Sequence, residues 1–262
     1  MGGFWLHPVS FIITGLLMLI GTQYEYYKMI RITGIRPQTF PGLLTGITTY
    51  IISTLVASGL APVTTFLILI PIMIIIIIME IYRKGERPFD SLAHTLFAVF
   101  YTALPFSMIP FSAFSKTGLN SLLPHGNIVF SPGIIVGFFI LIWANDTGAY
   151  LAGISFGRHR LMERISPKKS WEGFFGGVIT AAITGWLLSG WLGVVDNFKW
   201  VIISVIISIA GTYGDLAESM LKRSIGVKDS GTVMPGHGGF LDRFDSAIIS
   251  FPLVYLFISL FG

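Results

Sequence analysis

The stretch Gly214–Asp245, GDLAESMLKRSIGVKDSGTVMPGHGGFLDRFD, joins two strongly apolar segments through a polar loop. It contains five of the thirteen acidic and four of the seventeen basic residues of the chain. The apolar segments on either side have the composition of buried or membrane-embedded helices, so the stretch carries charge into the ends of two helices. Nothing else in the sequence concentrates so many reactive side chains.

Composition places the whole chain in a membrane. Of its 262 residues 53% are hydrophobic and only 11% charged, against about 25% charged in soluble proteins. The mean hydropathy is +0.77. These values predict an all-α, polytopic integral membrane protein. The absence of cysteine excludes disulfides, thiolate metal sites and a cysteine nucleophile.

Hydrophobic segments of about 17 to 25 residues are long enough to cross a bilayer as helices. We predict about eight such helices, near residues 8–24, 41–59, 61–81, 91–113, 129–152, 171–194, 199–217 and 245–261. The third, with the run Ile74–Ile78, is apolar all round, which is typical of a lipid-facing helix, and Pro71 is expected to bend it. Pro105 and Pro110 predict a kink in the fourth.

The basic residues indicate how the chain is oriented. Fifteen of the seventeen fall in the loops after the first, third, fifth and seventh predicted spans: Lys28, Arg31, Arg36, Arg83, Lys84, Arg87, Arg158, Arg160, Arg164, Lys168, Lys169, Lys222, Arg223, Lys228 and Arg243. The positive-inside rule makes these loops cytoplasmic. The net charge of +4 therefore follows the membrane and does not indicate a nucleic-acid partner.

The charged stretch has the residue types of a cation and phosphate site. Asp215, Ser219 and Lys222 share one face of the predicted helix, with a second cation in the neighbouring Arg223. Asp242 and Asp245 enter the next helix one turn apart. Carboxylates from two helices, flanked by cations, suit a divalent metal that bridges to a polyphosphate.

The loop between these helices adds the pair Lys228-Asp229 and a His-Gly-Gly turn, His237–Gly239. Glycines here can adopt positive φ and allow backbone N–H groups to approach an anion. His237 is a candidate general base because histidine titrates near neutral pH. The alternative is a phosphate-positioning or turn-stabilising role, which we favour because a phosphate nucleophile is already anionic.

The stretch resembles the signature of the phosphatidate cytidylyltransferase (CDP-diacylglycerol synthase) family. Seventeen of the twenty-seven residues from 219 to 245 match it: Ser219, Leu221, Lys222, Arg223, Lys228, Asp229, Gly231, Met234, Pro235, His237, Gly238, Gly239, Phe240, Asp242, Arg243, Phe244 and Asp245. A match of this length is far more specific than a short glycine motif.

Two further blocks resemble the same family. In Trp143–Gly153, Asp146 lies within an apolar segment. We expect Asp146 to contribute to the metal and phosphate site, and the alternative is that it only caps a helix or pairs with a neighbouring helix. Ser166–Gly173, SPKKSWEG, leads two lysines into a helix start, whose free N–H groups and positive dipole end favour phosphate binding. Basic loops also occur at membrane faces without any ligand. Glu172 has three interpretations: helix cap, metal ligand or partner of Lys169.

The resemblance implies that the chain transfers the cytidylyl group of CTP to phosphatidate, giving CDP-diacylglycerol and pyrophosphate. It implies catalytic roles for Asp215, Lys222, Arg223, Asp242, Arg243 and His237. It implies substrate contacts from Lys168, Lys169, Ser170, Ser219, Lys228, Asp229, Gly238, Gly239 and Asp146. Arg243 and Lys222 also have the alternative of neutralising buried aspartates.

The same resemblance implies Mg²⁺ on Asp215 and Asp242, with Asp146, Glu172 and Asp245 as further candidates, and leaves open a second cation such as K⁺. We expect a polar cavity at the cytoplasmic face of the cell inner membrane, and a homodimer. Residues 1–128 are predicted to form a transmembrane scaffold and residues 129–262 the catalytic region. The family usually begins with one more helix, so we expect that this chain lacks it.

Two other functions present similar residues. A CTP-dependent lipid kinase of the polyprenol or phytol type would phosphorylate an alcohol and release CDP. An ion-coupled transporter would use Asp146, Asp215 and Glu218 as ion sites. Such transporters often consist of two related halves, and no repeat relates the first four predicted spans to the last four.

Overall fold

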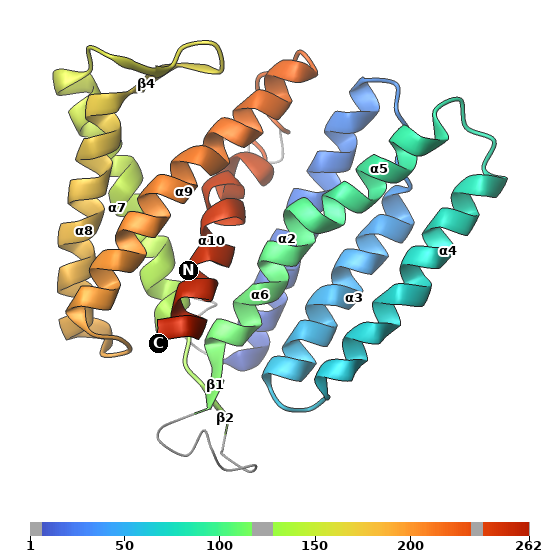
Figure 1. Ribbon diagram of the computed structural model, residues 1–262, viewed down its shortest axis with the longest axis horizontal. Helices are drawn as coiled ribbons and strands as arrows, with labels where there is room; N and C mark the ends of the chain where they lie inside the picture. Colours follow the sequence, from blue (N-terminus) through green and yellow to red (C-terminus); the bar gives the residue numbers. More distant parts are fainter. Residues whose placement is uncertain (1–6, 117–127, 232–237, 262) are drawn as a thin grey trace. The chain divides into compact units, whose positions relative to one another are not determined.

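The computed structural model describes residues 7–116, 128–231 and 238–261 and is dominated by long helices (Figure 1). The chain divides into two compact units. The first comprises residues 1–132 together with 229–242, and the second comprises 133–228 together with 243–262. The predicted division at 128 stays a prediction, and the signature stretch contributes residues to both units.

The described residues of the first unit form four long helical segments. They are α2 (Pro8–Ile32), α3 (Thr39–Ala57), the 3₁₀ turn η1 (Val63–Ile68) with α4 (Leu69–Tyr82), and α5 (Pro88–Ala98) continued by the π-helical turn η2 (Val99–Ala103) and α6 (Leu104–Ala113). A short antiparallel ladder, β1 (Phe114–Lys116) with β2 (Ile128–Phe130), follows. The π turn lies just before Pro105, in the segment predicted to kink.

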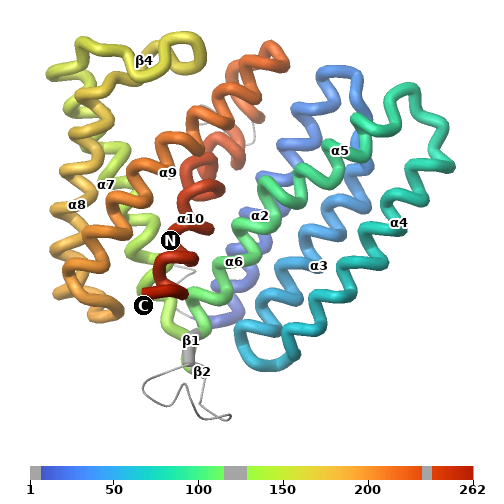
Figure 2. Tube along the Cα trace, in the orientation of Figure 1, coloured from blue at the N-terminus to red at the C-terminus, as the bar shows by residue number. Residues whose placement is uncertain are grey.

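Polar contacts tie the helices of this unit together. The chain reverses between α3 and α4, which lie side by side (Figures 1 and 2). Gln23 of α2 donates to the carbonyl of Gly42 in α3 at 2.9 Å. The hydroxyl of Tyr27 donates to the carbonyl of Thr95 in α5 at 2.8 Å. Inside an apolar core such bonds fix the relative rotation of the helices.

The second unit consists of α7 (Gly133–Phe156), α8 (Trp171–Leu192), α9 (Asn197–Ser224) and most of α10 (Leu241–Phe261). Helices α7, α8 and α9 pack against one another. A small side chain is needed where α7 meets α8, because a Cβ on Gly176 would lie 2.2 Å from the Cβ of Ala152. The rings of Phe138 in α7 and Phe251 in α10 pack edge to face, with their centroids 5.1 Å apart.

An antiparallel ladder precedes α8 in this unit. Strand β3 (Arg160–Met162) pairs with β4 (Ser166–Ser170). The SPKKS residues predicted as a loop thus form the strand β4. The ladder fixes the approach of both lysines to the start of α8.

Each of the eight predicted spans coincides with a helical segment, and the ends differ by up to eight residues, at the end of α2. Within the described residues, seven segments are long and apolar enough to cross a membrane, beginning with Thr39–Ala57. Helix α2 is not among them, since its second half contains polar residues such as Gln23 and Glu25. The chain is therefore an all-α, multi-pass membrane protein, and an eighth span stays a prediction. Segment Val63–Tyr82 has little of its surface buried, as expected of a lipid-facing helix.

Candidate functional site

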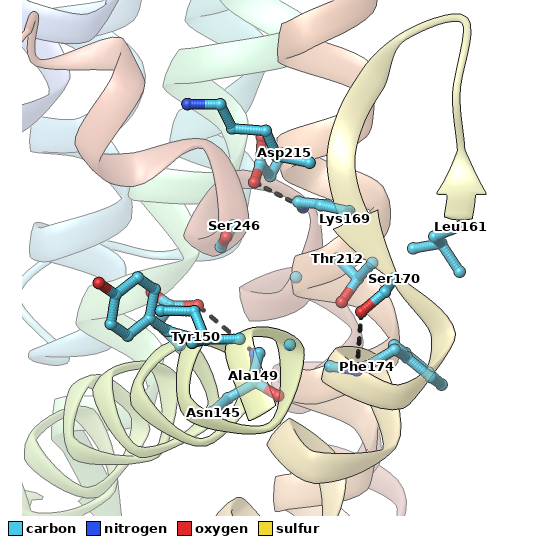
Figure 3. A pocket seen from close by; sticks show the side chains of 16 residues that line it. Asn145, Ala149, Tyr150, Leu161, Lys169, Ser170, Phe174, Thr212, Asp215 and Ser246 are labelled. Atoms are coloured by element: carbon cyan, nitrogen blue, oxygen red, sulfur yellow. Dashed lines mark hydrogen bonds and ion pairs between the residues drawn. The ribbon is translucent and has the colours of Figure 1, made fainter. Parts of the chain in front are cut away.

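A cavity of about 410 Å³ opens in the second unit, lined by residues of α7, the β3–β4 hairpin, α8, α9 and α10 (Figure 3). It gathers residues from separate parts of the sequence. Asp146 comes from α7, Lys168 and Lys169 from β4, and Asp215 from α9. Asp215 of the stretch Gly214–Asp245 and residues of both further blocks thus line one cavity, whereas the described signature matches from 219 to 245 are not among its lining residues. Its other walls are largely apolar, and include Tyr150, Ile154, Leu161 and Phe174.

An ion pair lies in this cavity. The Nζ of Lys169 is 2.5 Å from Oδ2 of Asp215 (Figure 3). Oδ1 of the same carboxylate accepts a hydrogen bond from the hydroxyl of Ser219, one turn further along α9, at 3.2 Å. The predicted common face of Asp215 and Ser219 is confirmed. A lysine and a carboxylate placed together in this way can bind a phosphate and a cation respectively.

Ser170 is the N-cap residue directly before α8 and also lines the cavity. Its hydroxyl accepts a hydrogen bond from the backbone N–H of Gly173 at 3.1 Å, which is a conventional N-cap. The N–H of Trp171 donates to the carbonyl of His159 at 2.9 Å. Two N–H groups that we expected to be free for a phosphate are therefore bonded within the protein, because the cap and the hairpin satisfy them. The positive end of the helix dipole remains.

Glu172 is bound to the start of the hairpin. Its carboxylate accepts from the backbone N–H groups of Arg158 at 3.1 Å and His159 at 3.2 Å. Its Oε1 also lies 2.6 Å from Nδ1 of His159. The ion pair of Lys169 is made with Asp215 instead. The interpretation of Glu172 as a metal ligand stays a prediction.

Three carboxylates converge beside the cavity. Asp215, Glu218 and Asp245 each offer an oxygen, and these oxygens lie within 4.8 Å of one another. Glu218 is fully buried, and its Oε2 lies 2.5 Å from Nζ of Lys222, itself buried. Hard carboxylate oxygens at this spacing fit a divalent cation such as Mg²⁺. Lysines beside two of the three supply positive charge to the same group of carboxylates.

Glu218 was not among the predicted metal ligands. The signal was present, because Glu218 stands three residues after Asp215 and four before Lys222, so a helix brings all three to neighbouring positions. Asp146, by contrast, was predicted and lines the cavity. Oδ1 of Asp146 is 3.5 Å from the side-chain nitrogen Nδ2 of Asn145.

Asp242 belongs to the first unit, where a hydroxyl and backbone N–H groups of the described residues lie around its carboxylate. Oδ2 accepts from the backbone N–H of Ser230 at 3.0 Å and from the N–H of Gly239 at 2.8 Å, and it lies 2.9 Å from the hydroxyl oxygen of Ser230. Gly238 has a φ of +78°, as the turn was predicted to require. The backbone N–H group presented after this glycine reaches a carboxylate of the protein itself.

Other predicted site residues lie on the surface or outside the described region. Arg223, Lys228, Asp229 and Arg243 have exposed side chains. Lys228 ends one segment of the second unit, and Asp229 begins a segment of the first. His237 lies outside the described residues, so its two predicted roles stay open.

The fold and the site define a class: a multi-pass membrane protein with a cavity that combines lysines and carboxylates. Comparison with known proteins gives the family. The model of the cytidylyltransferase family matches residues 1–261. Phosphatidate cytidylyltransferases of Staphylococcus epidermidis (strain ATCC 35984), S. haemolyticus and S. aureus (strain COL) are 34%, 36% and 35% identical to this chain over 192 residues, which cover 72% of it and 68% of each relative. The chain belongs to the cytidylyltransferase family.

Proposed function

We propose that this chain is a nucleotidyltransferase that transfers the cytidylyl group of CTP to phosphatidate, forming CDP-diacylglycerol and pyrophosphate. The observation that carries the proposal is the cavity of the second unit, where Asp146, Lys169, Ser170 and Asp215 meet. Lysine and carboxylate suit a triphosphate and its cation, while the apolar walls suit a lipid. Family membership and the names of the relatives support the same reaction.

In the reaction, a phosphate oxygen of phosphatidate attacks the α-phosphorus of CTP in line. The bond from that phosphorus to the oxygen bridging to the β-phosphate breaks, and pyrophosphate leaves. The nucleophile is already an anion, so the chain's main tasks are positioning and charge stabilisation. Lys169 binds a phosphate oxygen of CTP and releases Asp215, with Lys168 at the same edge of the cavity. Ser170 keeps the start of α8 in place through its cap.

We further propose that the resident cation is Mg²⁺, as the resemblance implies. Asp215 and Asp242 are proposed as ligands, with Glu218 and Asp245 completing the carboxylates around Asp215. When bound, the cation neutralises negative charge on the triphosphate. Lys222, Arg223, Lys228 and Arg243 are proposed to balance the remaining charge. A second cation such as K⁺ and a homodimer are likewise proposals from the resemblance. A cytoplasmic-facing site in the inner membrane is proposed from the distribution of the basic residues.

The proposal is tested by incubating the purified chain in detergent micelles with radiolabelled CTP, phosphatidate and Mg²⁺, and separating the lipid products. We expect a labelled CDP-lipid from the wild type, no product after chelation with EDTA, and loss of product in Asp242→Ala. Near-normal activity of Asp242→Ala would refute the role of Asp242. Phosphorylated alcohol and CDP, formed when a polyprenol replaces phosphatidate, would instead identify a lipid kinase.

A further inference from the structure

Glu25 is a buried carboxylate for which no function was predicted from the sequence. It lies in α2, in the part of the chain predicted to be scaffold, and only 1% of its surface is exposed. Burying a carboxylate costs free energy unless hydrogen bonds replace its water. The partners of Glu25 should therefore show why the chain holds a carboxylate there.

Those partners lie more than 200 residues further along the chain, in the loop between α9 and α10, here called the signature loop, and at the first residue of α10. Oε2 of Glu25 accepts from the hydroxyl of Ser230 at 2.9 Å and from the backbone N–H of Leu241, the first residue of α10, at 2.9 Å. The same Ser230 hydroxyl is 2.9 Å from Oδ2 of Asp242. One hydroxyl therefore lies between the carboxylates of Glu25 and Asp242. All of these residues belong to the first unit.

Two glycines of the signature make this approach possible. A Cβ on Gly239 would lie 2.2 Å from Oε2 of Glu25 and 2.2 Å from Oγ of Ser230. A Cβ on Gly231 would lie 2.6 Å from Oε1 of Glu25. Real side chains do not approach so closely, so a side chain at either position would have to displace the carboxylate of Glu25 from its hydrogen bonds. Both residues match the family signature, although the residue that they accommodate lies outside it.

We propose that Glu25 is a positioning residue for Asp242. It holds the start of α10 through the amide of Leu241 and one edge of the loop through Ser230, so the Asp242 carboxylate keeps a fixed orientation. Groups that orient a metal-binding carboxylate typically change metal affinity or activity about 10- to 100-fold when removed. This inference rests on the proposed function, in which Asp242 is a cation ligand.

The test compares Glu25→Ala and Glu25→Gln with the wild type by two measurements. The first is the Mg²⁺ concentration for half-maximal CDP-lipid formation, together with kcat. The second is hydrogen–deuterium exchange of the Leu241 amide in detergent, which needs no substrate. For Glu25→Ala we expect a loss of about 10- to 100-fold in kcat or Mg²⁺ affinity and faster exchange. Glu25→Gln keeps a carbonyl oxygen in reach of both donors and should show a smaller change.

Glu80→Gln is the matched control, because Glu80 is a buried glutamate of the same unit that pairs with Gln38 at 2.6 Å. It should leave the Mg²⁺ requirement and Leu241 exchange unchanged, whatever it does to thermal stability. If Glu25→Ala does not fold, Ser230→Ala removes the shared hydroxyl and should also raise the Mg²⁺ requirement.

Wild-type Mg²⁺ dependence and wild-type Leu241 exchange in Glu25→Ala would overturn the proposal, as would an effect of Glu80→Gln on the Mg²⁺ requirement as large as that of Glu25→Ala. A failure of the proposed function looks different. In that case the wild type makes no CDP-lipid, while the exchange measurement still decides whether Glu25 holds the start of α10.

Discussion

The two units hold their carboxylates in different ways. In the second unit, Asp215 and Glu218 are each paired with a lysine at 2.5 Å. In the first, Glu25 and Asp242 accept hydrogen bonds from a hydroxyl and from backbone N–H groups of Ser230, Gly239 and Leu241. Both arrangements offset the cost of burying negative charge.

The two units differ in whether the partner of a carboxylate can be replaced by a substrate phosphate or a cation. A lysine is a point charge on a long, rotatable stem, so it can leave a carboxylate when a phosphate or a cation arrives. A backbone N–H group cannot leave without moving the chain. The second unit is thus suited to changing partners during a reaction, while the first is suited to keeping a carboxylate in one orientation.

The largest effect is expected at the lysine-paired carboxylate of the cavity. Asp215→Asn removes the negative charge but keeps the size of the side chain, so activity should fall about 100- to 1,000-fold, as when an electrostatic contact that stabilises the transition state is lost. CDP-lipid formation at saturating CTP measures this. Asp196→Asn, at the exposed start of α9, is the control and should remain within about twofold because asparagine is also a good N-cap. Equal activities of the two variants would refute the role of Asp215.

The second-largest effect is expected at Lys169, the lysine paired with Asp215. Lys169→Ala should raise KM for CTP and lower kcat/KM about 10- to 100-fold, since a charge-assisted contact to phosphate is lost. Lys169→Arg should recover part of this because it restores the charge. Lys199→Ala should change neither constant, as its ion pair with Asp196 is long, at 3.8 Å, and faces solvent. A drop in kcat alone, with KM unchanged, would contradict a role of Lys169 in holding CTP.

The fixed arrangement can be broken by one methyl group. Gly239→Ala would place a Cβ against both Glu25 and Ser230, so we expect a stability loss of about 1–3 kcal/mol and lower activity. Gly190→Ala is the matched control in α8. A Cβ there meets nothing within 4 Å, so helix propensity should leave stability unchanged or raise it by up to about 1 kcal/mol. Thermal unfolding in detergent compares the two, and equal midpoints would show that the loop is not closely packed.

The smallest effect concerns the helix caps. Ser170→Ala removes the acceptor for the Gly173 N–H and should cost about 1 kcal/mol. Asp196→Ala removes the matching cap of α9, where Oδ1 accepts from the N–H of Lys199 at 2.8 Å, and should cost a similar amount. Only Ser170→Ala should also reduce activity, since Ser170 lines the cavity. An equal loss of activity in both variants would mean that the cap at the cavity has no special role.

Sequence patterns predicted the helical segments well because hydrophobic length and helix-breaking residues act locally. Each predicted span coincides with a helix, and the π turn lies in the segment with Pro105 and Pro110. The β3–β4 ladder was not predicted, since SPKKS lacks the alternation typical of a strand and is paired only through its neighbour. The N–H groups at the start of α8 were predicted to be free for a phosphate. Two of them are bonded instead to the hydroxyl of Ser170 and the carbonyl of His159, and no local pattern indicates these contacts.

The candidate site divides in the same way. The sequence by itself determined the membrane class, the helices, the family and most of the reactive residues, because composition and a long signature depend on residue identity alone. Only the tertiary structure decided that Lys169 pairs with Asp215, that Glu218 joins the carboxylates, and that Glu25 contacts the signature loop and the start of α10. These contacts join residues far apart in the chain or depend on exact side-chain direction, which no local pattern encodes.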